Sequence, residues 1–247
     1  LYNGPVAPLS NKFNHWIHLS RGYNGDIKTY DDFFKYVDYA QKNGFEFTYL
    51  MNSPKPFSEK DLSTFKSEFQ RSLDYLKKYN CKNIKVGNDQ IIDLIDKYAP
   101  NEFNIHTSCV FEYKNINQYK NLFNFYPNIK SINLAYDENQ NFKLIKNLRN
   151  EFPNIKIELM VNETCIKGCP NRLSCLVEIP KSQKCICSLS KNSFLSDFFK
   201  TSSIYPWNLA CYSALGINNF KFCALGTNYH NYRNNWHDIK NLKSYLS

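Results

Sequence analysis

Five of the nine cysteines in the chain fall within one stretch, at Cys165, Cys169, Cys175, Cys185 and Cys187. Thiolates gathered in this way can form disulfides, bind a zinc ion or hold an iron–sulfur cluster. Each of these would make the stretch the chemical centre of the protein. The spacing of the cysteines, and the elements that must position them, decide between the three interpretations.

The spacing favours an iron–sulfur cluster. An odd number of cysteines and the absence of a secretion signal speak against a disulfide framework. A structural zinc site usually has two cysteine pairs, each separated by two residues, whereas the gaps here are three, five, nine and one. Irregularly spaced thiolates beside glycine and proline, as in Gly168-Cys169-Pro170, suit a larger 4Fe-4S cluster, and zinc is the alternative. The remaining cysteines have apolar neighbours and are expected to be small buried residues, namely Cys81, Cys109, Cys211 and Cys223.

The elements around this stretch alternate between apolar, β-rich runs and runs with helical periodicity. Strands are predicted at residues 16–19, 45–51, 84–87, 103–109, 132–135, 155–161 and 220–224. Helices are predicted between and after them at residues 30–43, 58–79, 90–98, 116–125, 142–152, 206–215 and 238–246. This alternation is typical of a parallel sheet with crossover helices, so we expect an α/β fold, a TIM-type (β/α)8 barrel that forms one domain over residues 1–247.

Two regions depart from this regular alternation. Leu1 and Tyr2 have the character of the end of a further strand, so the barrel is expected to be either closed or incomplete at its N-terminus. Residues 162–203 show neither periodicity and contain the five clustered cysteines. Because loops that follow the carboxyl ends of barrel strands carry the active site, we predict that residues 162–203 form a cysteine-rich, cluster-binding loop at the mouth of the barrel.

The cysteine stretch also resembles a known family. The run Glu158-Leu159-Met160-Val161-Asn162-Glu163-Thr164-Cys165, continued by Cys169-Pro170-Asn171-Arg172, is similar to the cysteine motif of the collagenase-like peptidase family U-32. Residues 45–52, which end in asparagine, and residues 203–209, which contain a proline at a helix start, resemble other segments of that family. The likeness extends over nearly the whole chain and is specific at the Asn-Glu-x-Cys and Cys-Pro-x-Arg elements.

The resemblance implies a barrel that carries a 4Fe-4S cluster. Several members of the family act in oxygen-independent hydroxylation of RNA bases or quinone precursors, and others are labelled peptidases. This chain departs from the family pattern at two places, since Cys175 stands where a histidine is expected and the Cys185-Ile186-Cys187 pair is unusual. Five cysteines therefore compete for four ligand positions, with Cys165 and Cys169 preferred.

Polar residues at predicted strand ends could contact a substrate. Asn52 and Asn162 fall at the same predicted mouth as the cysteines, where they could bind substrate or cap the loops. Arg21 and Arg172 could bind a carboxylate or phosphate, and surface salt bridges are the alternative. His106 has a suitable pKa for a general base, although a buried structural histidine is the commoner case. No catalytic residue is assigned.

Composition limits the partners and the compartment. The formal net charge is +9, but the lysines are scattered, so an RNA or acidic partner is compatible with the sequence without being indicated by a basic block. No apolar run of membrane-spanning length and no signal peptide is present, so we expect a cytoplasmic protein without membrane partners. No glycine-rich phosphate loop is present, which argues against ATP or dinucleotide cofactors.

Three hypotheses for function follow. The first is an iron–sulfur enzyme that carries out oxygen-independent hydroxylation or a related redox modification of an RNA, peptide or small-molecule substrate. The second is a cluster- or zinc-bearing subunit that binds a partner protein, a peptide or RNA and supports chemistry performed elsewhere. The third is a peptidase or other hydrolase that does not depend on a metal.

Overall fold

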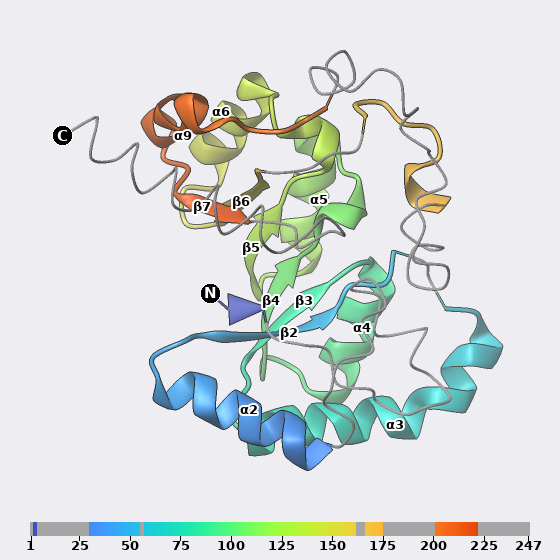
Figure 1. The fold of residues 1–247 in the computed structure, drawn as a ribbon. Helices are drawn as coiled ribbons and strands as arrows, with labels where there is room; N and C mark the ends of the chain where they lie inside the picture. The colour runs from blue at the N-terminus through green and yellow to red at the C-terminus, as the bar shows by residue number, and fades with distance from the viewer. Residues whose placement is uncertain (1, 4–29, 55–56, 162–165, 175–200, 222–247) are drawn as a thin grey trace, which may run out of the picture.

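The computed structural model describes residues 2–3, 30–54, 57–161, 166–174 and 201–221. Within these ranges, seven strands form one parallel sheet in which each strand pairs with the next one along the chain (Figure 1). The strands are β1 (Tyr2–Asn3), β2 (Phe47–Met51), β3 (Asn83–Val86), β4 (Asn104–Thr107), β5 (Ile129–Asn133), β6 (Lys156–Met160) and β7 (Asn219–Lys221).

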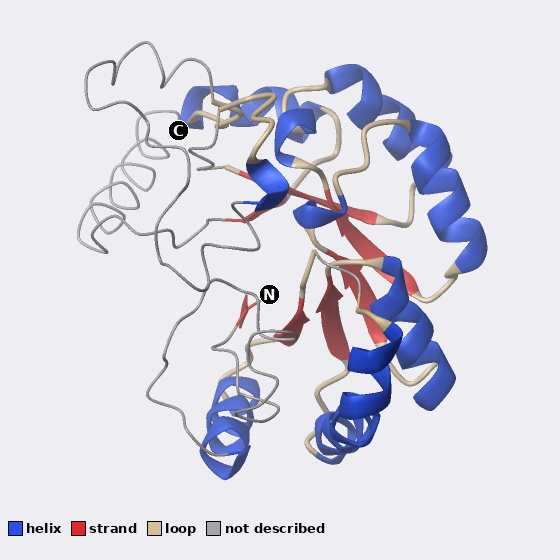
Figure 2. Cartoon of the chain, turned by 90° about the vertical axis from the view of Figure 1, so that its right-hand side faces the viewer, coloured by secondary structure: helices blue, strands red, loops and turns tan. Residues whose placement is uncertain are grey.

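Helices connect these strands. The α-helices are α2 (Tyr30–Lys42), α3 (Glu59–Lys78), α4 (Asp89–Tyr98), α5 (Ile116–Phe125), α6 (Phe142–Glu151) and α9 (Leu209–Ala214). Three short 3-10 helices are η1 (Cys109–Phe111), η2 (Tyr136–Glu138) and η3 (Pro206–Asn208). In Figure 2 the described helices lie in an arc around the outside of the strands. The described residues therefore form an incomplete α/β barrel, as expected from the alternating pattern.

Successive side chains of a strand point to opposite sides of the sheet, which gives the sheet two different faces. The residues that face the helices are apolar, as with Ile84 and Val86 on β3 and Ile157 and Leu159 on β6, and they join the main hydrophobic core. The intervening residues face the interior of the barrel. Helix α4 shows how the outer layer is fixed, because the Asn88 side chain caps its first turn at 3.1 Å from the Ile91 amide nitrogen.

Most predicted elements are found within a few residues of their expected positions. Helix α5 matches its prediction at both ends, and the stretch predicted as one helix at 206–215 is η3 followed by α9. Strand β5 begins three residues before its predicted start. The predicted strand at 16–19 and helix at 238–246 lie outside the described residues. Among the helices in the described ranges, none has the length and apolar character needed to cross a bilayer.

Candidate functional site

The cysteine stretch begins where β6 ends, at the carboxyl edge of the sheet. Residues 166–174 of this stretch are described, and they contain Cys169. Cys169 is half-buried, so part of its surface remains accessible at this edge. The other predicted ligands and two of the predicted substrate contacts lie outside the described residues, namely Cys165, Cys175, Cys185, Cys187, Arg21 and Asn162. Their roles stay predictions.

The turn that carries Cys169 has a defined backbone. The Cys169 amide donates to the Ile166 carbonyl at 3.2 Å, and the Arg172 amide donates to the Cys169 carbonyl at 3.3 Å. Gly168 has a φ of +71°, in the left-handed region that glycine adopts without strain. Its amide donates to the Asp137 carboxylate at 3.0 Å, which ties the turn to η2.

Arg172 strengthens this attachment from inside the protein. Its buried guanidinium donates to the Asp137 carboxylate at 2.7 Å and to the Ile166 carbonyl at 2.8 Å. The same group lies 3.8 Å from the Glu112 carboxylate and over the Tyr136 ring, 5.4 Å from its centroid. Arg172 thus joins its own turn to the segments that follow β4 and β5. Its predicted contact with a substrate is a separate role and stays a prediction.

The pKa values of the two carboxylates that face Arg172 are shifted in opposite directions. Burial favours the neutral form of Asp137, but the hydrogen bonds from Arg172 and Gly168 outweigh it and lower its pKa. Burial dominates at Glu112 and raises its pKa, with Arg172 opposing the shift. Glu112 also has a left-handed backbone, with φ +53°. The anchor is therefore a charged Asp137–Arg172 pair with a second, weaker carboxylate beside it.

The two ends of the cysteine stretch are held together at its base. Ile166 forms an antiparallel bridge with Thr201, and the Ile204 amide donates to the Val161 carbonyl at 2.8 Å. Asn139, which is fully buried, donates from its side chain to the Met160 carbonyl at 2.7 Å and the Ser202 carbonyl at 3.3 Å. We call this arrangement of Val161, Ile166 and residues 201–204, pinned by Asn139, the neck. It closes the chain back onto the sheet before η3 begins.

Asn52 lies where β2 ends and is buried, at the same carboxyl edge of the sheet. The segment after β3 packs directly against it, because a Cβ added at Gly87 would collide with the backbone of Asn52 and Ser53. No hydrogen-bond partner for the Asn52 side-chain oxygen is found in the described residues. Its placement suits the predicted substrate contact, which stays a prediction.

A second polar group lies inside the barrel and was not singled out from the sequence. Lys85, on β3, reaches across to Glu158 on β6, with 2.5 Å between the ammonium nitrogen and a carboxylate oxygen. Asn133, on β5, donates to the same carboxylate oxygen at 2.7 Å. Barrel interiors are usually filled with branched apolar side chains, so a buried ion pair here is unusual. The sequence signal is a polar residue at every second position of these strands, as in Asn83-Ile84-Lys85-Val86.

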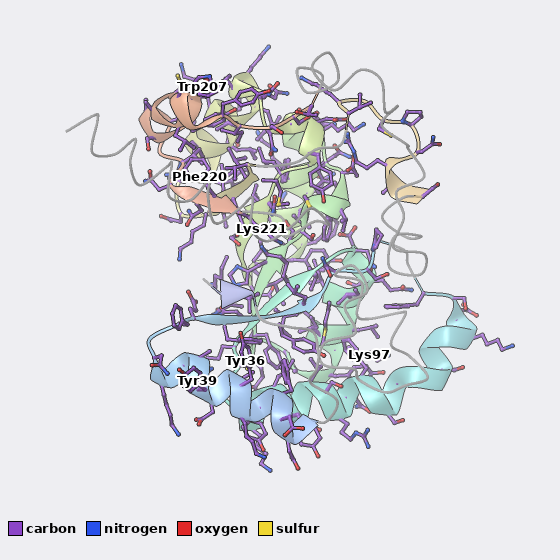
Figure 3. All side chains as sticks on the ribbon, in the orientation of Figure 1. Tyr36, Tyr39, Lys97, Trp207, Phe220 and Lys221 are labelled. Carbon is purple, nitrogen blue, oxygen red and sulfur yellow. The ribbon has the colours of Figure 1, made fainter. Side chains whose placement is uncertain are left out.

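A second cation, Lys221, acts on this pair. Burial is the largest influence on Lys85 and lowers its pKa, and the charge of Lys221 on β7 lowers it further while Glu158 opposes the shift. Burial would raise the pKa of Glu158, but the charges of Lys85 and Lys221 and the hydrogen bonds outweigh it and lower that pKa. The lowered pKa of Lys85 thus comes mainly from burial, whereas the lowered pKa of Glu158 comes from the two lysine charges and the hydrogen bonds. Figure 3 labels Lys221, the last residue of β7.

His106 lies on the inner face of β4. Its ring nitrogens contact the Ser131 hydroxyl at 2.6 Å and the Asn83 side-chain oxygen at 3.1 Å. Burial, with a smaller effect from Lys85, lowers the pKa of His106 to about 4. The imidazole is therefore neutral at physiological pH. Both its nitrogens are engaged with neighbouring strands, which fits a structural histidine better than a general base at the mouth.

The remaining cysteines differ in their surroundings. Cys81 and Cys109 are buried, as expected, and burial raises the pKa of the Cys81 thiol to about 12. Cys211, on α9, is exposed, so its prediction as a buried residue is wrong. A short helix with its apolar side at Tyr212 leaves the adjacent position on the outside. Within the described ranges, no three or more His, Cys, Asp or Glu side chains are grouped closely enough to hold a metal ion.

Comparison with known proteins supports the fold. No protein-family model and no curated protein matches the sequence. The structure is similar to that of the U32 peptidase Mk0906, with a TM-score of 0.53 and 13% sequence identity over 90% of this chain and 84% of that one. The resemblance to peptidase family U-32 is thus supported at the level of the fold.

Proposed function

We propose that this chain is a cytoplasmic, cysteine-ligated 4Fe-4S protein that carries out an oxygen-independent hydroxylation or a related redox modification. The observation that carries the proposal is the placement of Cys169. Its turn is fixed at the carboxyl edge of the sheet by the Asp137–Arg172 pair while the residue itself remains half-buried. A thiolate ligand needs a fixed backbone and a position that is not fully buried, and the placement of Cys169 supports the proposal on both counts.

The donor chemistry fits the group. Cys165 and Cys169 would hold the cluster together with two of Cys175, Cys185 and Cys187, and no oxygen or imidazole donor is required. When bound, such a cluster supplies electron transfer or an iron site that can polarise a substrate oxygen. Arg172 would hold the ligating turn against the barrel. Asn52 would offer its side-chain oxygen to a substrate at the same edge.

The substrate class rests on the family resemblance. An RNA base, a peptide or a small molecule would reach the carboxyl edge of the sheet, where β2 and β6 present Asn52 and the cysteine turn. The fold similarity to a U32 peptidase supports the architecture that this chemistry requires. A subunit that needs a partner protein for activity is the competing hypothesis, and it predicts that the purified chain binds the cluster without turnover.

Iron and acid-labile sulfide analysis of anaerobically purified protein tests the proposal. We expect about four iron and four sulfide per chain, a loss of both in Cys169→Ser, and no loss in Cys211→Ser. Cys211 is the matched control because it is an exposed cysteine on a helix. Zinc without sulfide, or iron retained in Cys169→Ser, would refute the cluster assignment.

The reaction is tested separately. Nucleosides and small metabolites from cells that contain or lack the protein are compared by mass spectrometry under anaerobic growth. We expect one product that carries an additional oxygen atom to disappear with the protein and with Cys169→Ser, and to persist with Cys211→Ser. A hydroxylated product that persists in Cys169→Ser would refute the role of the cluster in this reaction.

A further inference from the structure

The interior of the barrel contains a lysine, Lys85, whose surroundings suit a reactive amine better than a purely structural side chain. Lys85 lies one residue before the end of β3, with only 4% of its side chain exposed, and points away from the hydrophobic core that Ile84 and Val86 join. Placing an ammonium group in such a position costs several kcal/mol unless the charge is fully compensated. Here the compensating charge is the Glu158 carboxylate, on which a second lysine also acts.

The charges of two lysines act on one carboxylate. Glu158 contacts Lys85 directly and is also acted on by Lys221. The other titratable groups that act on Lys85 or lie beside it are Cys109, whose effect is small, and His106, which is neutral. A lysine beside a second cation in a desolvated site is the arrangement that converts an ammonium group into a nucleophilic amine.

The same space offers contacts for a ligand. The buried side-chain oxygens of Asn133 and Thr48 have no hydrogen-bond partner within the described residues. Asn133 is bonded through its nitrogen to the carboxylate that contacts Lys85, and Thr48 is on β2, the strand that pairs with β3. Glu158 keeps 12% of its side chain exposed, so the ion pair is not sealed from solvent. Unpaired buried acceptors are costly and are usually satisfied by a ligand or water.

We propose that Lys85 is a catalytic amine that forms an imine with the carbonyl carbon of a small aldehyde or ketone bound inside the barrel. The proton of the ammonium group passes to the Glu158 carboxylate, and the neutral amine attacks the carbonyl carbon. In the resulting carbinolamine, the oxygen takes one proton from the attacking nitrogen and a second from Glu158. Water then leaves, and a protonated imine with a carbon–nitrogen double bond remains beside the Glu158 carboxylate. The step is a condensation that requires no oxidant or reductant, and it is independent of the iron–sulfur cluster.

Reductive methylation with isotopically labelled formaldehyde and cyanoborohydride tests this directly, because the reagent reacts only through an imine at a neutral amine. Peptide mass spectrometry gives the labelling rate of Lys85 relative to Lys97, an exposed lysine on α4 (Figure 3). We expect the Lys85 to Lys97 ratio to rise as the pH is lowered from about 10 to about 7, because burial and the charge of Lys221 lower the pKa of Lys85 and leave more of its amine neutral. Restricted access of the reagent to the buried amine slows the labelling of Lys85 by the same factor at every pH, so it does not produce this trend.

Two outcomes would overturn the proposal. One is a ratio that does not change with pH, and the other is an unlabelled Lys85 when Lys97 is fully methylated, as expected for an inert structural ion pair. A Lys221→Met variant adds an independent readout, because removing the second cation should lower the ratio, whereas Lys120→Met on the surface should leave it unchanged. The same labelling pattern is expected in Cys169→Ser, so failure of the cluster assignment would not affect the result.

Discussion

Removing Asp137 should release the cysteine turn from the barrel. In Asp137→Ala, the Arg172 guanidinium loses its 2.7 Å carboxylate partner and the Gly168 amide loses its 3.0 Å acceptor, while both groups remain close to η2. Breaking a buried ion pair by removing one partner costs about 3–5 kcal/mol. Glu112 stays 3.8 Å from the guanidinium and offsets part of the loss. We therefore expect the free energy of unfolding to fall by about 3 kcal/mol, at the lower end of that range.

Urea unfolding followed by circular dichroism measures this change. The matched control is Glu151→Ala, which breaks the Lys120–Glu151 pair of nearly equal length, 2.8 Å, whose side chains are 41% and 44% exposed. An exposed pair of this kind contributes about 0.5 kcal/mol. If Asp137→Ala destabilises the protein no more than this control, the burial argument for the anchor is wrong.

The pH dependence gives a second check on the same residue. The pKa of Asp137 is lowered below its ordinary value of 3.8 in the folded protein. Its contribution is therefore present at neutral pH and is lost as the pH falls through the folded-state pKa. The difference in stability between wild type and Asp137→Ala should narrow only below about pH 4. A difference that already vanishes near pH 6 would point to another titrating group.

Two further predictions concern other parts of the barrel. His106 has a pKa of about 4 when folded against 6.5 as an ordinary histidine, so the unfolded chain binds the proton first and stability should fall by about 3 kcal/mol between pH 6.5 and 4. Urea unfolding across this pH range should show this fall in stability in wild type and not in His106→Asn. Equal pH profiles of the two proteins would contradict the prediction. Gly87→Ala should cost about 3 kcal/mol and displace Asn52, because the new methyl group meets the backbone of Asn52 and Ser53. Thermal unfolding measures this loss of stability, with Ala99→Gly as the control. A loss below about 1 kcal/mol would show that the backbone at Gly87 is not tightly packed against Asn52 and Ser53.

The outer layer of the fold was predictable because it depends on local periodicity. Asn115 caps α5 and Gln118 completes its capping box, and the helix runs between the residues expected from the sequence. The apolar alternation at Ile84 and Val86 likewise marks β3. Signals of this kind are contained within a few neighbouring residues, so they can be recognised without knowledge of the tertiary structure.

The inner layer was not predictable, because its contacts join residues far apart in the chain. Lys85 and Glu158 are separated by 73 residues, and Arg172 and Asp137 by 35. Sequence reasoning placed Arg172 at the mouth but could not show that two carboxylates would approach its guanidinium. The alternating polar residues of β3, β5 and β6 were visible in the sequence. A polar strand face can equally well lie against water, and only the barrel-like arrangement of the strands places it in the interior.

Because of the neck, the fold of the barrel does not depend on the length of the cysteine stretch. Because Val161, Ile166, Thr201 and Ile204 are joined at its base, the chain returns to the sheet at the same place however many residues lie between them. Lengthening a closed loop is inexpensive, at about 0.6 kcal/mol for each doubling. Insertions or deletions beyond the anchored turn at residues 166–174 should therefore leave β6, η3 and α9 in register. The sequence of this segment, and with it the chemistry that it supports, can therefore change while the fold of the barrel stays the same.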